Sequence, residues 1–268
     1  LIKEISGFKN IGFVPTMGCI HKGHESLIKI SKRRCKKTLV SIFVNPKQFN
    51  KRNDYITYPR NLHKDLKILR KLKVDFVYLP TKEKIFKKSL HKIILSKNQK
   101  ILCAKYRKGH FEGVLDVLDC FVNLISPRIM FLGKKDYQQY FLVKNFILKK
   151  YKTKVVACKT IRNSKGIALS SRNILLSNSD IKIAGFIAND LVKTKCSIRK
   201  KNNIKNKKLI KIEKIMQKVK KNLSQKYKIK IEYLECRNTI NLNTKILNKP
   251  FKIFIAFYLN KVRLIDNF

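Results

Sequence analysis

Short apolar runs separated by amphipathic stretches organise the first half of the chain. The runs are rich in Val, Ile and Phe, and each is followed by Pro, Asn or a polar turn. Continuous apolar runs of this length are typical of strands that are buried on both faces of a parallel sheet. They predict strands at Ile11–Val14, Leu39–Val44, Val74–Leu79 and Val155–Ala157.

Between these strands the apolar positions change to a helical period. Side chains recur at helical spacing within His24–Lys36, and helices are also expected over Leu62–Lys73 and from Gly113 to Pro127. Strands that alternate with helices form βαβ units, so this half predicts a doubly wound parallel sheet of the α/β class. Such sheets bind ligands at the carboxyl ends of their strands, where helix N-termini offer free N–H groups to phosphate.

The pattern changes after about Asn173. Helices are predicted at Ser179–Lys195 and Lys207–Lys226, joined by a polar, basic loop that begins at Lys193 and is expected to be exposed. Alternating runs then predict a small antiparallel sheet with strands at Ile229–Cys236, Ile253–Leu259 and Val262–Ile265. We therefore expect a doubly wound domain over residues 1–161 and a smaller C-terminal α+β domain over residues 162–268.

The charge balance is extreme, with 63 Lys and Arg against 16 Asp and Glu and a net charge of +47. Such a field attracts phosphorylated substrates, and it also permits non-specific nucleic-acid binding through counterion release. A dedicated nucleic-acid surface would cluster its basic residues on one element or within a known motif. Here the lysines are spread from Lys3 to Lys261, which favours compositional drift at solvated positions over a specific nucleic-acid partner.

Cysteine usage and hydropathy indicate a reducing, cytoplasmic setting. The seven cysteines are odd in number, scattered and without a C-x-x-C pair, so they predict neither a zinc ribbon nor a disulfide framework. The apolar run Ile253–Leu259 is far shorter than the roughly 20 residues that a bilayer span requires. The N-terminal stretch LIKEISGFKN lacks the apolar segment of a secretory signal, so we expect no membrane association.

The first candidate site is the turn Val14–His24, between the first predicted strand and the first predicted helix. Gly18 and Gly23 let the backbone come close to a ligand, and the helix N-terminus adds its dipole. His21 and His24 can each donate a ring N–H to phosphate oxygens, and protonation strengthens that bond. The turn therefore predicts a phosphate site.

Three alternatives for this turn stay open. Its two glycines have the spacing of a P-loop, but His24-Glu25 stands where Lys-Ser/Thr would follow, which argues against a Walker A site. A zinc site built on His21 and His24 would need further ligands from elsewhere in the chain. The turn could also be a surface loop whose histidines have no chemical role.

The second candidate segment ends the second predicted strand. Asn45 and Gln48 are neutral donor-acceptors that could fix a hydroxylated carboxylic acid beside the same crevice. Taken alone, an Asn-Pro pair at a strand end is ordinary turn chemistry. The assignment therefore depends on the neighbouring segments.

Two later segments offer groups for a nucleotide. After the apolar run Ile129–Leu132, Lys135 can neutralise phosphate, Asp136 can take a metal or a ribose hydroxyl, and Gln139 can bind substrate. A solvated helix start is the alternative for this segment. The segment 169–173 adds two serine hydroxyls and a guanidinium suited to a polyphosphate, although it is a weak signal alone.

Taken in this order, the segments resemble the pantothenate synthetase family, the pantoate–β-alanine ligases. The resemblance spans almost the whole chain and is carried by PTMGCIHKGH, SIFVNPKQF, YPRNL, RKGHFEGV, GKKDYQQ, TIRNSKGIALSSRN and RLIDN. The His-x-Gly-His turn and the Ser-Ser-Arg segment also resemble elements of the wider HxGH nucleotidyltransferase-like superfamily, which has a Rossmann-like core.

The resemblance implies an ATP-dependent ligase that condenses pantoate with β-alanine to pantothenate. The reaction would proceed through a pantoyl-adenylate and release AMP and pyrophosphate. ATP with Mg²⁺ would be the co-substrate, residues 1–161 would bind ATP and pantoate, and residues 162–268 would form a lid. The family also implies a homodimer.

The resemblance further implies a role for each matching residue. His24, assisted by His21, would contact the departing pyrophosphate as a proton donor or positive group, with Lys135 and Arg172 over the phosphates. Pantoate would be held by Gln48 and Gln139, with Asn45, Tyr58 and Arg107 as further substrate contacts, and Asp136 would meet ATP-bound Mg²⁺. The implied nucleotide site comprises Met17, Gly18, Cys19, Ile20, His21, Lys22, Gly23, His24, Gly133, Lys134, Lys135, Asp136, Ile161, Leu169, Ser170, Ser171 and Arg172.

The chain departs from the family pattern at several positions. Lys134 stands where Glu is common, a charge reversal that could re-tune nucleotide binding or point outward without effect. Lys108 replaces a usual Pro and Ala104 a usual Gly, so that loop is expected to be less rigid. The chain begins at Leu1 without Met, and we expect part of the first strand-helix unit to be missing.

Two other functions remain open from the sequence. One is an adenylyl- or cytidylyltransferase on the same core, whose product would retain the nucleotide. The other is a basic nucleic-acid-binding module, or a degenerate protein that keeps the fold without ATP turnover.

Overall fold

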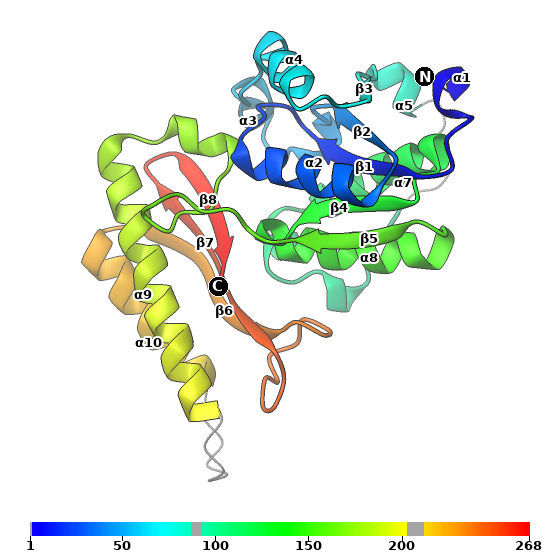
Figure 1. Ribbon diagram of the computed structural model, residues 1–268. Coiled ribbons are helices and arrows are strands. Elements are labelled where there is room, and N and C mark those ends of the chain that lie inside the picture. The colour runs from blue at the N-terminus through cyan, green and yellow to red at the C-terminus, as the bar shows by residue number, and fades with distance from the viewer. Residues whose placement is uncertain (1, 87–92, 203–211) are drawn as a thin grey trace. The chain divides into compact units, whose positions relative to one another are not determined.

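The computed structural model describes residues 2–86, 93–202 and 212–268. The chain divides into two compact units (Figure 1). The first contains the residues up to Ile161 together with Leu169–Ser171, and the second contains Arg162–Ala168 and Arg172–Phe268.

The first unit is built on a five-stranded parallel sheet with strand order β3-β2-β1-β4-β5. Its strands are β1 (Ile11–Thr16), β2 (Lys37–Ile42), β3 (Phe76–Tyr78), β4 (Ile129–Gly133) and β5 (Lys154–Cys158). The predicted α/β class and doubly wound sheet are therefore confirmed. β3 is shorter than predicted because Val74 belongs to the preceding turn, where its N–H donates to the Leu69 carbonyl at 3.1 Å.

Eight α-helices are described in the first unit, several of them a single turn. They are α1 (Ile2–Ile5), α2 (Lys22–Arg34), α3 (Arg52–Ile56), α4 (Leu62–Lys71), α5 (Lys82–Phe86), α6 (Cys103–Tyr106), α7 (His110–Ile125) and α8 (Tyr137–Lys150). α7 begins one turn before the predicted start at Gly113. That glycine lies inside the helix, where a Cβ would come within 2.6 Å of the Lys47 carbonyl oxygen.

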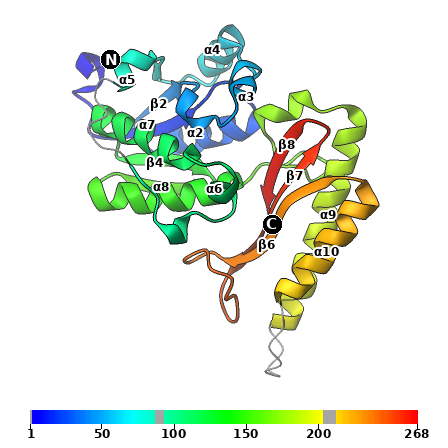
Figure 2. The ribbon, with the colours of Figure 1, turned by 180° about the vertical axis from the view of Figure 1, so that it is seen from behind.

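The alternation of side chains along β1 sends neighbouring residues into different cores. Val14 belongs to a cluster with Leu27 and Ile28 of α2. Phe13 packs edge-to-face on Phe121 of α7, with ring centroids 5.7 Å apart. Figure 2 shows α7 on the face of the sheet opposite to α2. Both faces of β1 are thus buried, which explains its continuous apolar run.

The order of the strands reverses between β1 and β4. The chain runs outward from β1 through β2 to β3 and then crosses to β4 on the other side of β1. At such a switch point the connections leave the two central strands in opposite directions, which opens a crevice at their carboxyl ends. The Val14–His24 segment includes the end of β1 and the turn after it, and Gly133–Asp136 begins at the last residue of β4, so both candidate segments meet this point.

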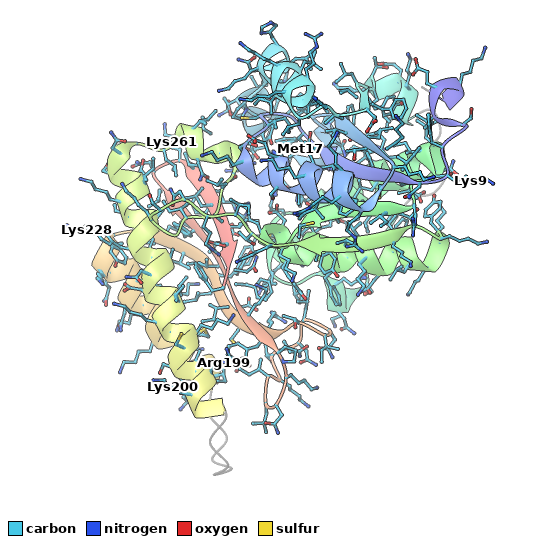
Figure 3. The ribbon with its side chains drawn as sticks, viewed as in Figure 1. Lys9, Met17, Arg199, Lys200, Lys228 and Lys261 are labelled. Atoms are coloured by element: carbon cyan, nitrogen blue, oxygen red, sulfur yellow. The ribbon has the colours of Figure 1, made fainter. Side chains whose placement is uncertain are left out.

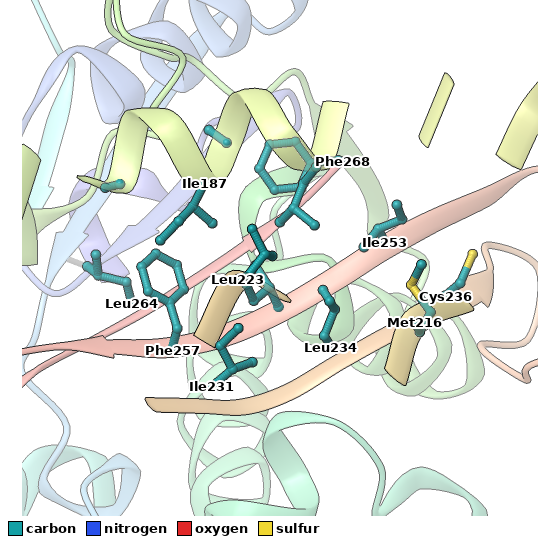
Figure 4. Close-up of a cluster of buried hydrophobic side chains, with 14 of the residues drawn as sticks. Ile187, Met216, Leu223, Ile231, Leu234, Cys236, Ile253, Phe257, Leu264 and Phe268 are labelled. Atoms are coloured by element: carbon teal, nitrogen blue, oxygen red, sulfur yellow. The ribbon is translucent and has the colours of Figure 1, made fainter. Parts of the chain in front are cut away.

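The second unit packs two helices against an antiparallel sheet of order β6-β7-β8. Buried side chains from all five elements form its core, including Ile187, Leu223 and Phe257 (Figure 4). The elements are α9 (Asn178–Asn202), α10 (Ile212–Tyr227), β6 (Lys230–Asn238), β7 (Phe251–Leu259) and β8 (Val262–Asn267). The predicted small α+β architecture is confirmed.

The loop predicted from Lys193 is wrong as far as Asn202, because α9 continues through this stretch. Leu191 and Ile198 lie two helical turns apart and are 0% and 1% exposed, so the basic stretch covers a buried apolar face. The rest of that loop and the start of the next predicted helix fall on residues 203–211, outside the described residues. Every helix in the described ranges is too short or too polar to span a bilayer.

Candidate active site

The turn after β1 is held by two side chains from neighbouring elements. The Thr16 hydroxyl donates to the Ser41 carbonyl at 2.7 Å and accepts from the Gly18 N–H at 3.2 Å. The carboxylate of Asp65, in the first turn of α4, accepts the N–H groups of Cys19 at 2.8 Å and Ile20 at 2.7 Å. Asp65 was missed by sequence reasoning, although it lies only a few residues after the quoted YPRNL segment.

His21 caps the N-terminus of α2. Its backbone is extended, and its Nδ1 accepts the Gly23 N–H at 3.1 Å, so the neutral ring carries its proton on Nε2. A Cβ at Gly23 would lie 2.7 Å from His21 Cε1, so any larger residue there would displace the His21 ring. In the described hydrogen-bond network, the main-chain N–H groups of Lys22 and His24 have no protein acceptor and remain available to an anion.

The two imidazoles of the turn form a close pair. Their centroids are 4.1 Å apart, and the ring planes are tilted by 32°. His24 Nδ1 is buried and has no hydrogen-bond partner within the described residues. Such an unsatisfied buried atom marks a position that a ligand or water can complete.

Both histidines are held in the neutral form near pH 7. Burial, helped by the charges of His21 and Lys135, lowers the pKa of His24 to about 3. Burial and Lys135 lower the pKa of His21 to about 4, against the opposing charge of Asp136. The neutral His24 ring can donate a hydrogen bond from its N–H, but both the proton-donor role and the positive contact suggested for it require a bound polyanion to restore the second proton.

Lys135 lies in the short 3-10 helix η3 (Lys134–Asp136) after β4, where it contacts Asp136. Its Nζ is 3.2 Å from Asp136 Oδ1, and the two side chains are 18% and 43% exposed. A largely buried ammonium close to two neutral imidazoles favours the arrival of a polyanion. The described residues contain no group of three or more His, Cys, Asp or Glu side chains placed to hold a metal ion.

The substituted residue Lys134 occupies a different environment from Lys135. Its side chain is exposed, and its charge acts on Cys158 at the end of β5. Burial raises the pKa of the Cys158 thiol, and the charges of Arg34 and Lys134 partly oppose that rise. Neither histidine pKa is affected by Lys134, which favours the outward-pointing alternative for this charge reversal.

The segment Leu169–Ser171 returns to the first unit and joins the site. The Leu169 N–H donates to the Ile161 carbonyl at 2.9 Å, and the buried Ser171 hydroxyl hydrogen bonds to the Cys19 thiol. Burial, helped by the Asp65 charge, raises the pKa of Cys19, so its thiol stays protonated. Arg172, the next residue, belongs to the second unit.

The backbone carbonyl of Gln48 is hydrogen bonded, whereas its side-chain carboxamide is available for a ligand. Its carbonyl accepts from His110 Nδ1 at 2.6 Å and from Arg107 Nη2 at 2.9 Å. Arg107 Nη1 also donates to His110 Nε2 at 3.1 Å, which fixes the imidazole proton on Nδ1. Gln48 is 8% exposed, and its carboxamide has no protein partner in the described part of the chain.

The remaining predicted substrate contacts differ in availability. The Asn45 amide donates to the Gly113 carbonyl at 2.8 Å, and its oxygen accepts the Lys47 N–H at 3.1 Å. Asn45 is 0% exposed, which favours a role in holding Gln48 over direct substrate contact. Tyr58 is buried with its ring edge-on to Phe49 at 5.5 Å, and Gln139 is half-buried in the first turn of α8.

One unit thus gathers most of the predicted nucleotide-site residues at the switch point of a parallel sheet. Met17 begins the turn at the end of β1 (Figure 3). The site is completed by the segments that contain His21–His24, Lys135 and Ser171, all within the first unit. Neutral N–H donors, helix-terminal amides and a buried ammonium suit the binding of a polyphosphate.

Comparisons with known proteins agree with this arrangement. The family model described as pantoate-beta-alanine ligase matches residues 2–268. A pantothenate synthetase of Leptospira interrogans (strain 56601) is 43% identical, with 97% of this chain and 90% of the relative covered. The crystal structure of pantothenate synthetase from Thermus thermophilus has a TM-score of 0.87 at 27% identity, covering 100% of this chain and 96% of that one. A second crystal structure is that of the pantoate-beta-alanine ligase from Francisella tularensis, complexed with beta-gamma ATP and beta-alanine. It has a TM-score of 0.79 at 37% identity and covers 100% of this chain and 95% of that one.

The match runs over nearly the full length of the chain and includes every segment that forms the site. The chain therefore belongs to the pantoate–β-alanine ligase family.

Proposed function

We propose that this protein condenses pantoate with β-alanine in an ATP-dependent reaction, through a pantoyl-adenylate, releasing AMP and pyrophosphate. The family match supports the overall reaction. The observation that carries the assignment of the site is the convergence of His21, His24 and Lys135 at the β1–β4 switch point.

ATP would place its phosphates at the N-terminus of α2. The free N–H groups of Lys22 and His24, the two ring N–H donors and the Lys135 ammonium supply hydrogen bonds and positive charge there. A polyanion beside the histidines would raise their lowered pKa values, because it stabilises the protonated rings. We therefore infer that His24 takes up positive character only when the nucleotide is bound.

The chemical step brings two anions together. A carboxylate that attacks the α-phosphorus must overcome repulsion from the phosphates, and fixed donors and cations offset this repulsion. Holding the two reactants in line supplies further rate, with effective-molarity effects worth up to about 7–11 kcal/mol. The neutral amine of β-alanine would then attack the mixed anhydride and displace AMP.

Pantoate would be held by the carboxamides of Gln48 and Gln139. The Gln48 side chain is open, while its carbonyl is fixed by Arg107 and His110. This arrangement favours Arg107 as a residue that positions Gln48. Asn45 would support the same segment through its bonds to Gly113 and Lys47.

Asp136 would help to hold the Mg²⁺ that accompanies ATP. The Asp136 carboxylate suits this role because it is 43% exposed and lies beside Lys135 within the phosphate-binding segment. When bound, the ion would neutralise phosphate charge.

The second unit would act as a lid, with Arg172 contributing its guanidinium to the phosphates. Its own compact core supports treatment as a separate domain. We further propose a homodimer, as the family implies. A cytoplasmic location is supported by the seven cysteines, all of which are free thiols in the described residues.

The experiment that tests this function uses pantoate labelled with oxygen-18 in its carboxylate. Incubation with ATP, Mg²⁺ and β-alanine should give pantothenate, pyrophosphate and AMP that carries one labelled oxygen, measured by mass spectrometry. Unlabelled AMP would overturn the adenylate step. A product that retains the nucleotide would instead establish a nucleotidyltransferase, and the absence of any ATP turnover in a folded sample would overturn the ligase function.

A further inference from the structure

Asp65 organises the turn that carries both histidines, although it comes from a different helix. Its Oδ2 accepts the Cys19 N–H at 2.8 Å and its Oδ1 accepts the Ile20 N–H at 2.7 Å. The residue is 2% exposed, and the Asn61 side chain caps its helix by accepting the Lys64 N–H at 2.9 Å. A rigid helix start thus presents both carboxylate oxygens to consecutive main-chain N–H groups.

The turn needs such support because its backbone is strained. Gly18 has φ +79°, and Cys19 has φ +52°, a backbone conformation that residues other than glycine rarely adopt. Hydrogen bonds to an ionised carboxylate are roughly twice as strong as neutral ones, so two of them can hold the left-handed Cys19 in place. A Cβ at Gly18 would lie 2.9 Å from Asp65 Oδ2, so the carboxylate leaves no room for a side chain at this position.

The segment that Asp65 binds, Cys19–Ile20, is directly followed by the histidine pair. Ile20 immediately precedes His21, which caps α2 and lies 4.1 Å, centroid to centroid, from His24. A shift of the Cys19–Ile20 peptides would therefore move the histidine pair and the free N–H groups of α2 together. Misplacement of catalytic groups by about 1 Å can cost roughly 100-fold in rate.

We propose that Asp65 is a positioning residue for adenylate formation, acting through main-chain hydrogen bonds to the histidine turn. This inference rests on the proposed function. It predicts that loss of one carboxylate oxygen acts on the ATP half of the reaction. In Asp65→Asn, the new NH₂ group faces a main-chain N–H, so one bond is lost and two donors oppose each other.

The matched control is Asp75→Asn. The Asp75 carboxylate also accepts a main-chain N–H, from Thr38 at 2.9 Å, and it pairs with Lys37 at 3.1 Å. It lies just before β3, at the amino end of the sheet and away from the histidine turn. A purely structural role for Asp65 predicts that the two variants behave alike.

Three readouts separate the two roles. They are the urea unfolding midpoint, kcat and KM for ATP in pantoate-dependent pyrophosphate release, and the imidazole nitrogen NMR signals of His21 and His24, with His63 as reference. We expect Asp65→Asn to lower kcat/KM for ATP by about 10- to 100-fold and to shift the His21 and His24 signals. We expect Asp75→Asn to lower the unfolding midpoint and to leave kcat and both signals unchanged.

Wild-type kinetics and unshifted imidazole signals in folded Asp65→Asn would overturn the proposal. If that variant does not fold, Asp65→Glu decides, because it keeps both acceptors but moves them by one methylene. A similar rate loss and signal shift support the proposal, whereas wild-type values overturn it. If the wild-type protein itself shows no pantoate-dependent release, the proposed function fails, and the imidazole signals still test the position of the turn.

Discussion

The rings of His21 and His24 pack against each other at a tilt of 32°, with centroids 4.1 Å apart, at the beginning of α2. Two protonated imidazoles at this distance would repel each other, and burial disfavours the charge of each. The pair is therefore neutral in the resting protein, and its protonation is coupled to the arrival of a polyanion. This coupling determines how stability and activity respond to pH and to charge substitutions.

The histidine pair should make the fold sensitive to mild acid. The folded pKa values of about 4 and about 3 lie below the ordinary value of 6.5, so the unfolded chain binds more protons between pH 6.5 and 3. The stability contribution is therefore fully present above pH 6.5 and is lost as the pH falls through that window. The free energy of unfolding of wild type and His24→Gln can be measured in urea at several pH values. It should fall less steeply with decreasing pH in the variant, by at most about 1 kcal/mol per pH unit. His63→Gln, which changes an exposed histidine outside the turn, is the matched control for a histidine substitution.

Lys135 should influence the histidines through its charge. Its ammonium lowers the pKa of both rings, so Lys135→Met should raise both pKa values, as measured by NMR titration of the imidazole protons. The same variant should reduce pantoate-dependent pyrophosphate release by roughly 100-fold, because a charge that stabilises the phosphates is lost. Lys134→Met is the neighbouring control and should change neither the histidine pKa values nor the rate. Equal effects of the two substitutions would contradict the assignment of Lys135.

Gln48 should affect the affinity for pantoate more than stability. Its carboxamide is open, so Gln48→Ala should raise the KM for pantoate by about 10- to 100-fold, the expected loss for a hydrogen bond to a charged group. The control is Gln138→Ala, because the Gln138 amide nitrogen donates to the Ile101 carbonyl at 2.7 Å, whereas its Oε1 is buried without a partner in the described residues. That variant should lower the free energy of unfolding by about 1–3 kcal/mol and leave the KM for pantoate unchanged. The reverse pattern would show that Gln48 is structural.

The core of the second unit should be sensitive to truncation within the basic part of α9. Ile198 is 1% exposed, so Ile198→Ala should lower the free energy of unfolding by about 2–5 kcal/mol. Arg199→Ala changes the next residue, which covers no comparable core position, and should have a smaller effect. Similar losses in both variants, measured by urea unfolding, would contradict the packing of this face.

The sequence predicted the sheet well because strands buried on both faces are continuous apolar runs with clear ends. It failed where charge concealed periodicity. The polarity of the stretch after Lys193 predicts a loop, yet Lys and Arg are good helix formers, and Ile198 continues the buried face of Leu191. A test of periodicity across the charged residues would have extended the helix.

The candidate site was predictable where polar residues come directly after strands, as for His21, His24 and Lys135. It was not predictable where the partner of a residue is distant in the chain. Asp65 meets Cys19 only because α4 packs beside the β1 turn, and the Asn45 amide donates its hydrogen bond to the carbonyl of Gly113 in α7. Those contacts depend on tertiary packing that local patterns do not encode.

The role of His24 in adenylate formation is best tested by pantoate-dependent pyrophosphate release in wild type, His24→Ala and His63→Ala. In the wild type, release should require ATP, Mg²⁺ and pantoate and should continue with β-alanine. The rate should fall by roughly 100-fold or more in His24→Ala and stay unchanged in His63→Ala. An unchanged rate in folded His24→Ala, or no release by folded wild-type protein, would show that His24 does not have this role or that the protein is not this ligase.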